Sequence, residues 1–234
     1  MPRGQNKYYL KQPGLRPSDK IKVAVVTGGH PFDVPGLIAM FDRMPQIDYY
    51  IQDLDNWAAD SGGVWEDYDV HLFYTMHYWG KLSVRKDMDE RILAMFDRIG
   101  EREHGLFIWH HALLGFIDTP SWSKLCNIEH RRLRGCDAGE VVNTAIADPN
   151  HPITRNIQPW TMVDEVYLMD EPDDNSTTIL TTDNGKSMTK LAWCHEHEKA
   201  RVFCYESGHD NINYTDPSFQ AVMLRAIQWC ARKI

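Results

Sequence analysis

The first half of the sequence alternates short apolar runs with amphipathic helical segments, and this alternation limits the possible folds more than any other feature. Residues 22–27 form a β-branched run that ends at a pair of glycines, and residues 34–44 follow with apolar side chains at helical spacing. Alternation of this kind predicts right-handed crossovers and a parallel sheet. Strands are expected at 22–27, 48–53, 70–75 and 105–109, and helices at 34–44 and 84–99.

The second half has a different pattern, in which β-rich segments follow one another with turns rather than helices between them. This pattern predicts antiparallel strands at 161–169, 177–182, 191–195 and 201–205. Residues 216–232 then close the chain as a helix with one apolar face. We therefore expect an α/β fold in which a mostly parallel sheet carries helices on both faces and an antiparallel extension in the second half.

The domain organisation follows from the absence of any stretch with the composition of an interdomain linker. Residues 1–20 are polar, contain proline and glycine, and lack periodicity, which is typical of an arm that precedes a domain. We therefore expect an N-terminal arm at 1–20 and a single domain at 21–234.

The balance of charges argues against nucleic acid and anionic membranes as partners. The chain has 25 Lys and Arg against 33 Asp and Glu, and its formal net charge is -8. Apolar runs such as residues 23–26 are far shorter than the roughly 20 residues that span a bilayer, and the polar N-terminus lacks a signal-peptide core. Five cysteines without a Cys-x-x-Cys spacing are typical of reduced thiols. These features predict a cytoplasmic protein that acts on a small molecule, as a monomer or as a homo-oligomer.

Two histidines, His110 and His111, directly follow the buried strand expected at 105–109. Ligands of parallel α/β sheets bind beyond the carboxyl ends of the strands, so these rings lie where chemistry is expected. Because adjacent side chains of an extended chain point to opposite faces, only one of the two should face the crevice. That imidazole could act as a general base, a general acid or a metal ligand; two histidines satisfied within the core are the structural alternative.

The loop after the first expected strand carries the paired glycines Gly28 and Gly29, followed by His30 and Asp33. Backbone amides at the glycines could approach a ligand closely. No Gly-x-Gly-x-x-Gly or Walker pattern can be completed here, so a dinucleotide or ATP is not expected. His77 lies past the third expected strand and could reach the same crevice, although imidazoles on surface loops often have no function.

Further polar groups come from the second half of the chain. The strand at 161–169 places Glu165 and Tyr167 on one face, because side chains alternate with a period of two. A partly buried glutamate beside histidines could orient an imidazole, hold a cation or act as the acid-base group. His209 and Asp210 follow the last expected strand after a glycine, which suits a catalytic imidazole. A solvated edge strand and a plain loop histidine are the structural alternatives.

The segment of Cys194, His195, Glu196 and His197 looks like a metal site, because a His-x-His pair on a strand projects both imidazoles to one side. Its polar residues also lie just before another strand. A hairpin turn is the simpler interpretation, and we do not expect a metal at this segment.

Six short segments carry a resemblance that covers nearly the whole chain after residue 20. They are Thr-Gly-Gly-His at 27–30, Gly-Leu-Phe-Ile-Trp-His-His at 105–111, His-Pro-Ile at 151–153, Glu-Val-Tyr at 165–167, Arg-Val-Phe at 201–203 and Gly-His-Asp at 208–210. In this order they resemble the ThuA family of trehalose-utilisation proteins. The resemblance implies a fold similar to that of class I glutamine amidotransferases, with a flavodoxin-like sheet.

The resemblance also shows where this sequence departs from the amidotransferases. They have a nucleophilic cysteine in the turn after the strand that corresponds to 105–109, where this chain has His110 and His111. None of the five cysteines lies in a Gly-x-Cys-x-Gly motif, so glutamine hydrolysis by a Cys-His pair is not expected. The position of His209 resembles that of the amidotransferase histidine, which implies a retained crevice with different chemistry.

The association of the family with the catabolism of trehalose and related glycosides implies a sugar or 3-keto sugar as the substrate. A ketone acidifies the neighbouring C–H bonds, so a histidine or glutamate base could drive isomerisation, hydrolysis or elimination of the glycosidic substituent. We expect catalytic roles for His111, Glu165 and His209. Contacts with the substrate are expected from His30, Asp33, His77, Trp109, His110, Tyr167 and Asp210.

The sequence requires no cofactor, but a divalent metal could be held by His110 or His111 together with Glu165 and His209. Three functions stay open at this point. The first is a lyase, hydrolase or isomerase that acts on a sugar or keto sugar. The second is a non-catalytic carbohydrate-binding or regulatory protein, and the third is a metal-dependent hydrolase of another substrate class.

Overall fold

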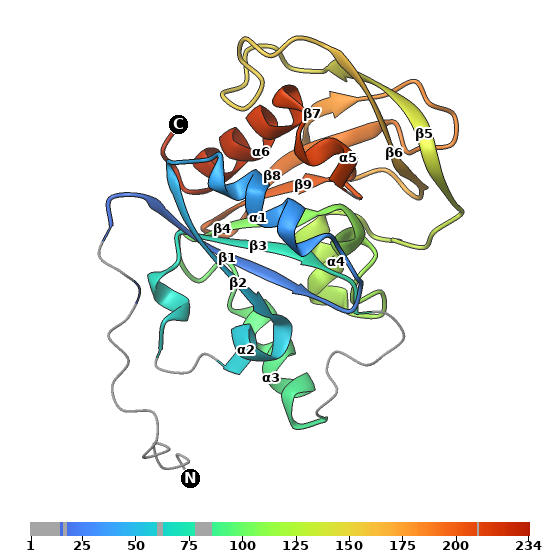
Figure 1. Ribbon diagram of the computed structural model, residues 1–234. Helices are drawn as coiled ribbons and strands as arrows, with labels where there is room; N and C mark the ends of the chain where they lie inside the picture. Colours follow the sequence, from blue (N-terminus) through green and yellow to red (C-terminus); the bar gives the residue numbers. More distant parts are fainter. Residues whose placement is uncertain (1–14, 16–17, 60–62, 78–85, 210) are drawn as a thin grey trace.

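Nine strands of the described residues form one sheet in the computed structural model, in the order β2-β1-β3-β4-β9-β8-β7-β5-β6 (Figure 1). Strands from both halves of the chain therefore share a single sheet. Most of the N-terminal arm expected at 1–20 lies outside the described residues. The structure describes residues 15, 18–59, 63–77, 86–209 and 211–234.

Four neighbouring strand pairs are parallel: β1 with β2, β1 with β3, β3 with β4, and β4 with β9. The alternating pattern predicted parallel strands among β1 to β4, whereas β9 was expected among the antiparallel strands. Side chains of β1 pack on both faces, Val23 and Val25 on one and Ala24 and Val26 on the other. A strand buried on both faces requires the continuous apolar run that the sequence shows. The bounds are β1 (Ile21–Gly28), β2 (Ile47–Asp53), β3 (Val70–Thr75), β4 (Gly105–Trp109) and β9 (Ala200–Tyr205).

The other four pairs are antiparallel, so the sheet is mixed and the expectation of a mostly parallel sheet was wrong. The difference arises because β5 extends over 12 residues and adds two antiparallel neighbours to the sheet. Its sequence contains two glycines, an Asp and an Asn, which are depleted in strands, and no strand was predicted there. The bounds are β5 (Gly135–Ile146), β6 (Trp160–Leu168), β7 (Thr177–Thr181) and β8 (Lys190–His197).

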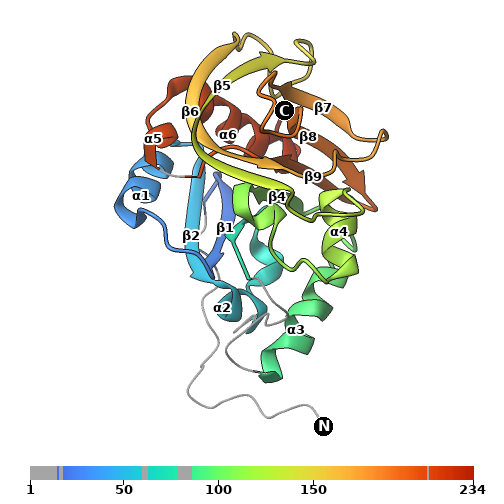
Figure 2. The same ribbon diagram turned by 90° about the vertical axis from the view of Figure 1, so that its right-hand side faces the viewer.

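Strands β5 and β6 form a long two-stranded ribbon at the edge of the sheet, and it arches over the end of the molecule (Figure 2). The pairing shifts between Asp137 and Glu140, as at a β-bulge, which bends a ribbon. In the described part of the sheet, β5 meets β7 at two residue pairs, one of which joins Ala145 to Thr181. Strand pairing therefore joins the ribbon to the rest of the described sheet over a short length.

Helices cover both faces of the sheet, as predicted (Figure 1). One face packs against α1, α5 and α6, and the other against α2, α3 and α4. Helices α2, α4 and α5 were not predicted from the sequence. The bounds are α1 (Val34–Asp42), α2 (Leu54–Ala59), α3 (Lys86–Asp97), α4 (Pro120–Cys126), α5 (Asn211–Tyr214) and α6 (Pro217–Cys230), with 3-10 turns η1 (Trp65–Asp67) and η2 (His110–Leu113).

All five cysteines are free thiols, and four of them are buried, which agrees with their interpretation as reduced residues. None of the described helices has the length and apolar character needed to cross a membrane.

Candidate functional site

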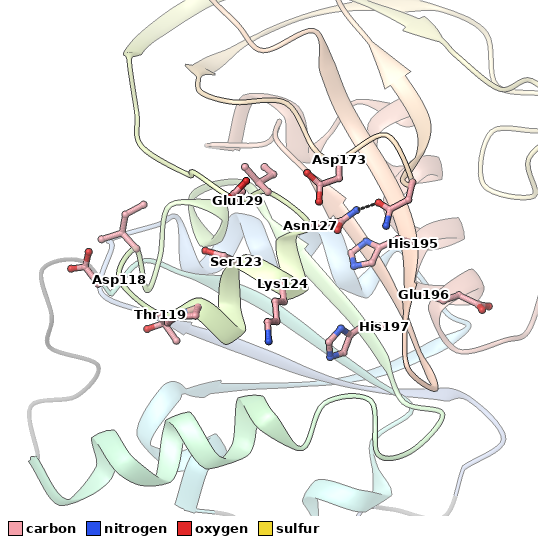
Figure 3. A pocket seen from close by; sticks show the side chains of 14 residues that line it. Asp118, Thr119, Ser123, Lys124, Asn127, Glu129, Asp173, His195, Glu196 and His197 are labelled. Carbon is pink, nitrogen blue, oxygen red and sulfur yellow. Dashed lines mark hydrogen bonds between the residues drawn. The ribbon is translucent and has the colours of Figure 1, made fainter.

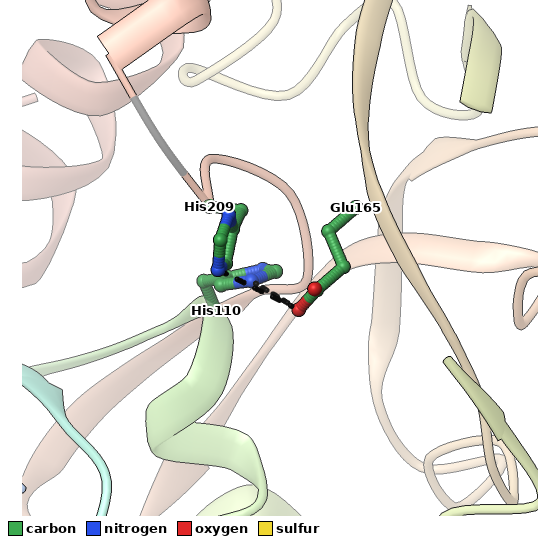
Figure 4. A group of neighbouring side chains, drawn as sticks. All are labelled: His110, Glu165 and His209. Carbon is green, nitrogen blue, oxygen red and sulfur yellow. Dashed lines mark ion pairs between the residues drawn. The ribbon is translucent and has the colours of Figure 1, made fainter. Parts of the chain in front are cut away.

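Three segments that are distant in the sequence meet at the carboxyl edge of the parallel strands (Figure 4). His110 begins the η2 turn directly after β4, and His209 lies in the loop after β9. Glu165 comes from β6 of the ribbon and faces both rings. The mixed sheet therefore assembles the site, because its parallel half supplies the histidines and its antiparallel half the carboxylate.

The three side chains are close enough to act on one ligand. The Nε2 atom of His110 lies 3.5 Å from Oε1 of Glu165, and Nε2 of His209 lies 3.8 Å from the same oxygen. One ligand atom from each residue lies within 4.8 Å of the others, and this is the one group of three or more such residues found in the described chain. Two imidazoles and a carboxylate are a common ligand set for divalent transition metals.

His110 is held in a strained backbone conformation at the turn. Its φ is 51°, a left-handed value that is uncommon for residues other than glycine. Its Nδ1–H donates to the carbonyl of Glu206, and the Tyr167 hydroxyl lies 2.7 Å from Nε2. The Nδ1 hydrogen bond selects the tautomer whose Nε2 lone pair points into the site. Strain maintained by such contacts is typical of functional residues.

A buried arginine fixes the turn that carries His110. Arg131 donates from Nη1 to the carbonyls of Leu113 at 2.7 Å and Gly115 at 2.6 Å, and from Nη2 to that of Phe116 at 2.8 Å. Its side chain is 2% exposed. The guanidinium therefore satisfies the buried carbonyls of Leu113 and Gly115 and adds a second donor at that of Phe116, which also accepts the Thr119 N–H.

The loop of His209 is fixed by a second carboxylate, Asp164, on the opposite face of β6 from Glu165. Asp164 accepts the backbone N–H of Gly208 at 2.5 Å and that of His209 at 3.0 Å. Gly208 has a φ of 103°, and a Cβ atom there would lie 2.5 Å from Nε1 of Trp109. Glycine is thus required at this turn by both conformation and space.

The electrostatics keep Glu165 ionised. Burial raises its pKa, but hydrogen bonds from His110 and Tyr167 outweigh this effect and lower the pKa to about 2. Burial in turn lowers the pKa of His110, while the carboxyl groups of Glu165, Asp164 and Glu206 raise it, with a net increase. An anionic carboxylate beside a readily protonated imidazole is suited to acid-base work or to binding a cation.

Glu206 is a fully buried carboxyl group beneath the site. Its Oε1 accepts the backbone N–H of Tyr167 at 2.6 Å, and the Ser207 hydroxyl donates to Oε2 at 3.3 Å. Burial raises the pKa of Glu206 to about 8. The group is therefore protonated in the folded protein near pH 7, although an exposed glutamate would be ionised.

Substitution of Glu206 by glutamine is expected to reduce the pH dependence of stability. In the native chain Glu206 retains its proton up to about pH 8, whereas the unfolded chain releases it near 4.5. The free energy of unfolding must therefore decrease as the pH rises between these values. Glutamine has no proton to lose, so Glu206→Gln should remove about 4 kcal/mol of this decrease. Urea unfolding at pH 5 and pH 8.5 measures the effect, and equal pH dependence in both proteins would contradict it.

His111 lies behind the site rather than in it. Its ring is buried, stacks on His30 at 4.5 Å and lies 4.2 Å from the ring of Tyr74. Burial lowers the pKa of His111 to about 2, so this imidazole is neutral. Among the described residues neither ring nitrogen has a hydrogen-bond partner, and neither is accessible. Of the adjacent pair it is His110 that meets Glu165, which corrects the assignment of His111 as the catalytic ring.

Three of the residues expected to contact the substrate, His110, His30 and Tyr167, lie at the cluster. The His30 ring packs edge-on to His209 at 5.4 Å, and its Nδ1 lies 2.7 Å from the carbonyl of Pro31. Tyr167 is buried, and its hydroxyl contacts His110. His30 therefore borders the cluster, and Tyr167 holds His110 from inside the protein.

The remaining expected contacts have other environments. Trp109 is fully buried with its Nε1 bonded to the Ser207 carbonyl, so the expected stacking on a sugar is not available. Asp33 caps helix α1 and accepts a hydrogen bond from Asn211. His77 lies against Thr75 and Phe116, without a recorded contact to the cluster. Asp210 lies outside the described residues.

Sequence reasoning missed three residues around the site: Asp164, Glu206 and Cys136. Cys136 is exposed as a residue and pairs with Tyr167 across the ribbon. Partial burial of its thiol, together with the nearby Glu165, raises the pKa of Cys136 to about 11. A signal was present for Asp164, because period two places it on the buried face of β6, where a carboxylate needs partners. Cys136 could not be found because β5 was not predicted.

A separate cavity lies on the α4 face of the sheet and has a volume of about 690 Å³ (Figure 3). His195 and His197 of β8 line this cavity, and in the part of the chain that the structure describes they belong to no group of three potential metal ligands. Lys124 of α4 lies opposite them. No residue of the His110 cluster lines this cavity.

Comparisons with solved structures show which fold this is. A ThuA-like protein from Parabacteroides merdae superposes with a TM-score of 0.68 at 17% identity, covering 92% of this chain and 91% of that one. A ThuA-like protein from Bacteroides uniformis gives 0.69 at 12% identity, covering 94% and 95%. The PurLQS structure from Thermotoga maritima gives 0.61 at 12% identity, covering 90% and 99%. These likenesses support the glutamine amidotransferase-like fold that the sequence suggested.

Sequence comparison adds the family. No curated protein matches the chain. The family model described as ThuA, trehalose utilisation, matches residues 63–230, which include η2, the β5–β6 ribbon and the loop of His209. The chain therefore belongs to the ThuA family.

Proposed function

We propose that the protein is an enzyme of carbohydrate catabolism that acts on 3-keto glycosides at the cluster of His110, Glu165 and His209, with the neighbouring His30 as the base. The observation that carries this proposal is the convergence of the three cluster side chains on one point, with ligand atoms within 4.8 Å of one another. Membership of the ThuA family supports a role related to trehalose utilisation.

The same residues fit a divalent metal. His110 presents the lone pair of Nε2, because Nδ1–H is engaged with a backbone carbonyl, and Glu165 is anionic. With His209 they leave open positions for substrate oxygens, as catalytic metal sites require. A metal bound there would act as a Lewis acid toward the keto oxygen.

His30 is the imidazole placed to move a proton beside this ligand set. Burial lowers its pKa, which keeps the ring neutral near pH 7. Its Nδ1 faces the Pro31 carbonyl and donates to it, so the Nε2 lone pair is left to act as a base. Removal of the proton from the carbon between the ketone and the anomeric centre gives an enolate. Its collapse breaks the anomeric C–O bond, and the departing oxygen takes up a proton, yielding an unsaturated keto sugar and an alcohol.

The direct test is conversion of keto sugars by the purified protein. We expect 3-keto-trehalose or 3-keto-glucosides to be consumed, and mass spectrometry should detect the released sugar or alcohol. A chelator should abolish the reaction and added metal should restore it. Absence of conversion for every keto sugar, with or without metal, would exclude the proposed function.

Metal binding at this site is expected to weaken as the pH falls. The pKa of His110 lies above its ordinary value of 6.5, so protons compete with the metal already near neutral pH. Glu165, with a pKa of about 2, stays ionised throughout this range. Isothermal titration with Zn²⁺ should therefore show an affinity at least about 10-fold lower at pH 6 than at pH 8.5. Equal affinity at both values would show that His110 is not a ligand.

A further inference from the structure

Large apolar side chains are exposed along a band that passes the His110 cluster. Six such residues are exposed in the described part of the chain, and five of them lie on contacting elements. The sixth, Ile234, is at the end of the chain. The five are Val141 on β5, Val163 on β6, Ile212 on α5, and Val34 and Ile38 on α1.

The part of this band nearest the cluster is set by the register of the ribbon. Val163 lies two residues before Glu165 on β6, so both side chains point to the same face, about 7 Å apart along the strand. Val141 is the cross-strand partner of Val163. The two valines are 57% and 39% exposed, Val141 being the more open. They form an apolar step directly outside the carboxylate.

Helix α5 packs against β6 beside these valines. Asn213 donates from Nδ2 to the carbonyl of Val163 at 3.1 Å, which fixes the helix against β6. Ile212, the preceding residue, is 56% exposed. Figure 2 shows α1, α5 and β6 side by side, and α5 begins two residues after His209. Val141, Val163 and Ile212 together are called the apolar shelf.

We infer that the apolar shelf binds the aglycone of the substrate, so that the enzyme selects glycosides with an apolar aglycone over the free sugar. This inference rests on the proposed function, which places the sugar ring at the cluster. The glycosidic substituent is attached beside the reacting carbon, so it must leave the cluster along one of its open sides. The shelf is one such side, and it is apolar and begins two residues from Glu165 along β6. An aryl or alkyl group that packs against the shelf removes its own apolar surface and that of the shelf from water.

The shelf can be tested by binding alone, without turnover. We expect p-nitrophenyl glucoside to bind wild-type protein about 10-fold more tightly than methyl glucoside. The Val163→Thr variant keeps the shape of the side chain and introduces a hydroxyl, so it should remove most of this preference while methyl glucoside binds as before. Isothermal titration with both anomers gives the affinities. Ile234→Thr is the control, because Ile234 is similarly exposed but lies at the chain end.

The outcomes separate the shelf from the proposed function. Equal binding of both glucosides by the wild type, or an unchanged preference in Val163→Thr and Val141→Thr, would overturn the shelf while sugar recognition stands. If neither glucoside binds and no keto sugar is converted, both the shelf and the proposed function are rejected. Sedimentation of the wild type as a dimer and of Val163→Thr as a monomer would show that a second copy covers the band, which also overturns the inference.

Discussion

Replacement of Glu165 by glutamine is expected to lower kcat/KM for a 3-keto glycoside by about 10³-fold and to abolish tight metal binding. The carboxylate contacts both His110 and His209, at 3.5 and 3.8 Å. Glutamine preserves the size of the side chain but removes the charge that balances a metal or an imidazolium. Steady-state kinetics and metal content by mass spectrometry measure the two effects in the same preparation.

Two further variants make this result specific. Glu196→Gln changes an exposed glutamate on β8, outside the cluster, and should leave both kinetics and metal content unchanged. His30→Gln should retain the metal but slow turnover, because His30 is assigned to proton transfer rather than to ligation. Full activity of Glu165→Gln would remove the cluster from the mechanism.

Replacement of Arg131 by methionine should have the largest effect on stability, a loss of about 3–5 kcal/mol in the free energy of unfolding. The guanidinium bonds three carbonyls, and methionine would leave those of Leu113 and Gly115 buried without this donor. The substitution also loosens the turn that follows His110, so activity should fall in the protein that still folds. Urea unfolding monitored by circular dichroism gives the free energy.

Arg132 provides the matched control because it is the next residue and is exposed. Arg132→Met should change the free energy of unfolding by no more than about 0.5 kcal/mol. Arg131→Lys distinguishes charge from geometry, since lysine keeps the charge but cannot reach three carbonyls with a planar fork. Similar stability of Arg131→Met and Arg132→Met would show that the carbonyls find other donors.

Sequence reasoning succeeded where local pattern and structure agree. The strands expected at 70–75 and 105–109 have the same bounds as β3 and β4, because apolar runs buried on both faces end abruptly at polar or turn residues. The shared face of Glu165 and Tyr167 follows from strand periodicity alone, and both side chains contact His110.

The choice between His110 and His111 could not be made in this way. The alternation rule assumes an extended chain, but the backbone at His110 is left-handed, which turns its ring toward β6. This conformation is imposed by tertiary contacts, among them the bond from His110 to the Glu206 carbonyl. Strand β5 was not predicted because its Gly, Asp and Asn residues have a weak strand propensity. Here too a tertiary contact decides the conformation, since pairing with β6 overrides this propensity.

Because the ribbon pairs with the sheet over a short length, the geometry of the site depends on whether the ribbon is docked. Glu165 reaches the histidines only when β6 is docked, and β5 joins the rest of the described sheet at two residue pairs. Undocking of the ribbon would withdraw Glu165 together with Asp164, which holds the His209 loop, at a free energy below that of global unfolding. The measured affinity of any ligand that uses Glu165 is then its intrinsic affinity multiplied by the docked fraction. Ligand binding and protection of the ribbon amides from hydrogen exchange should therefore rise together.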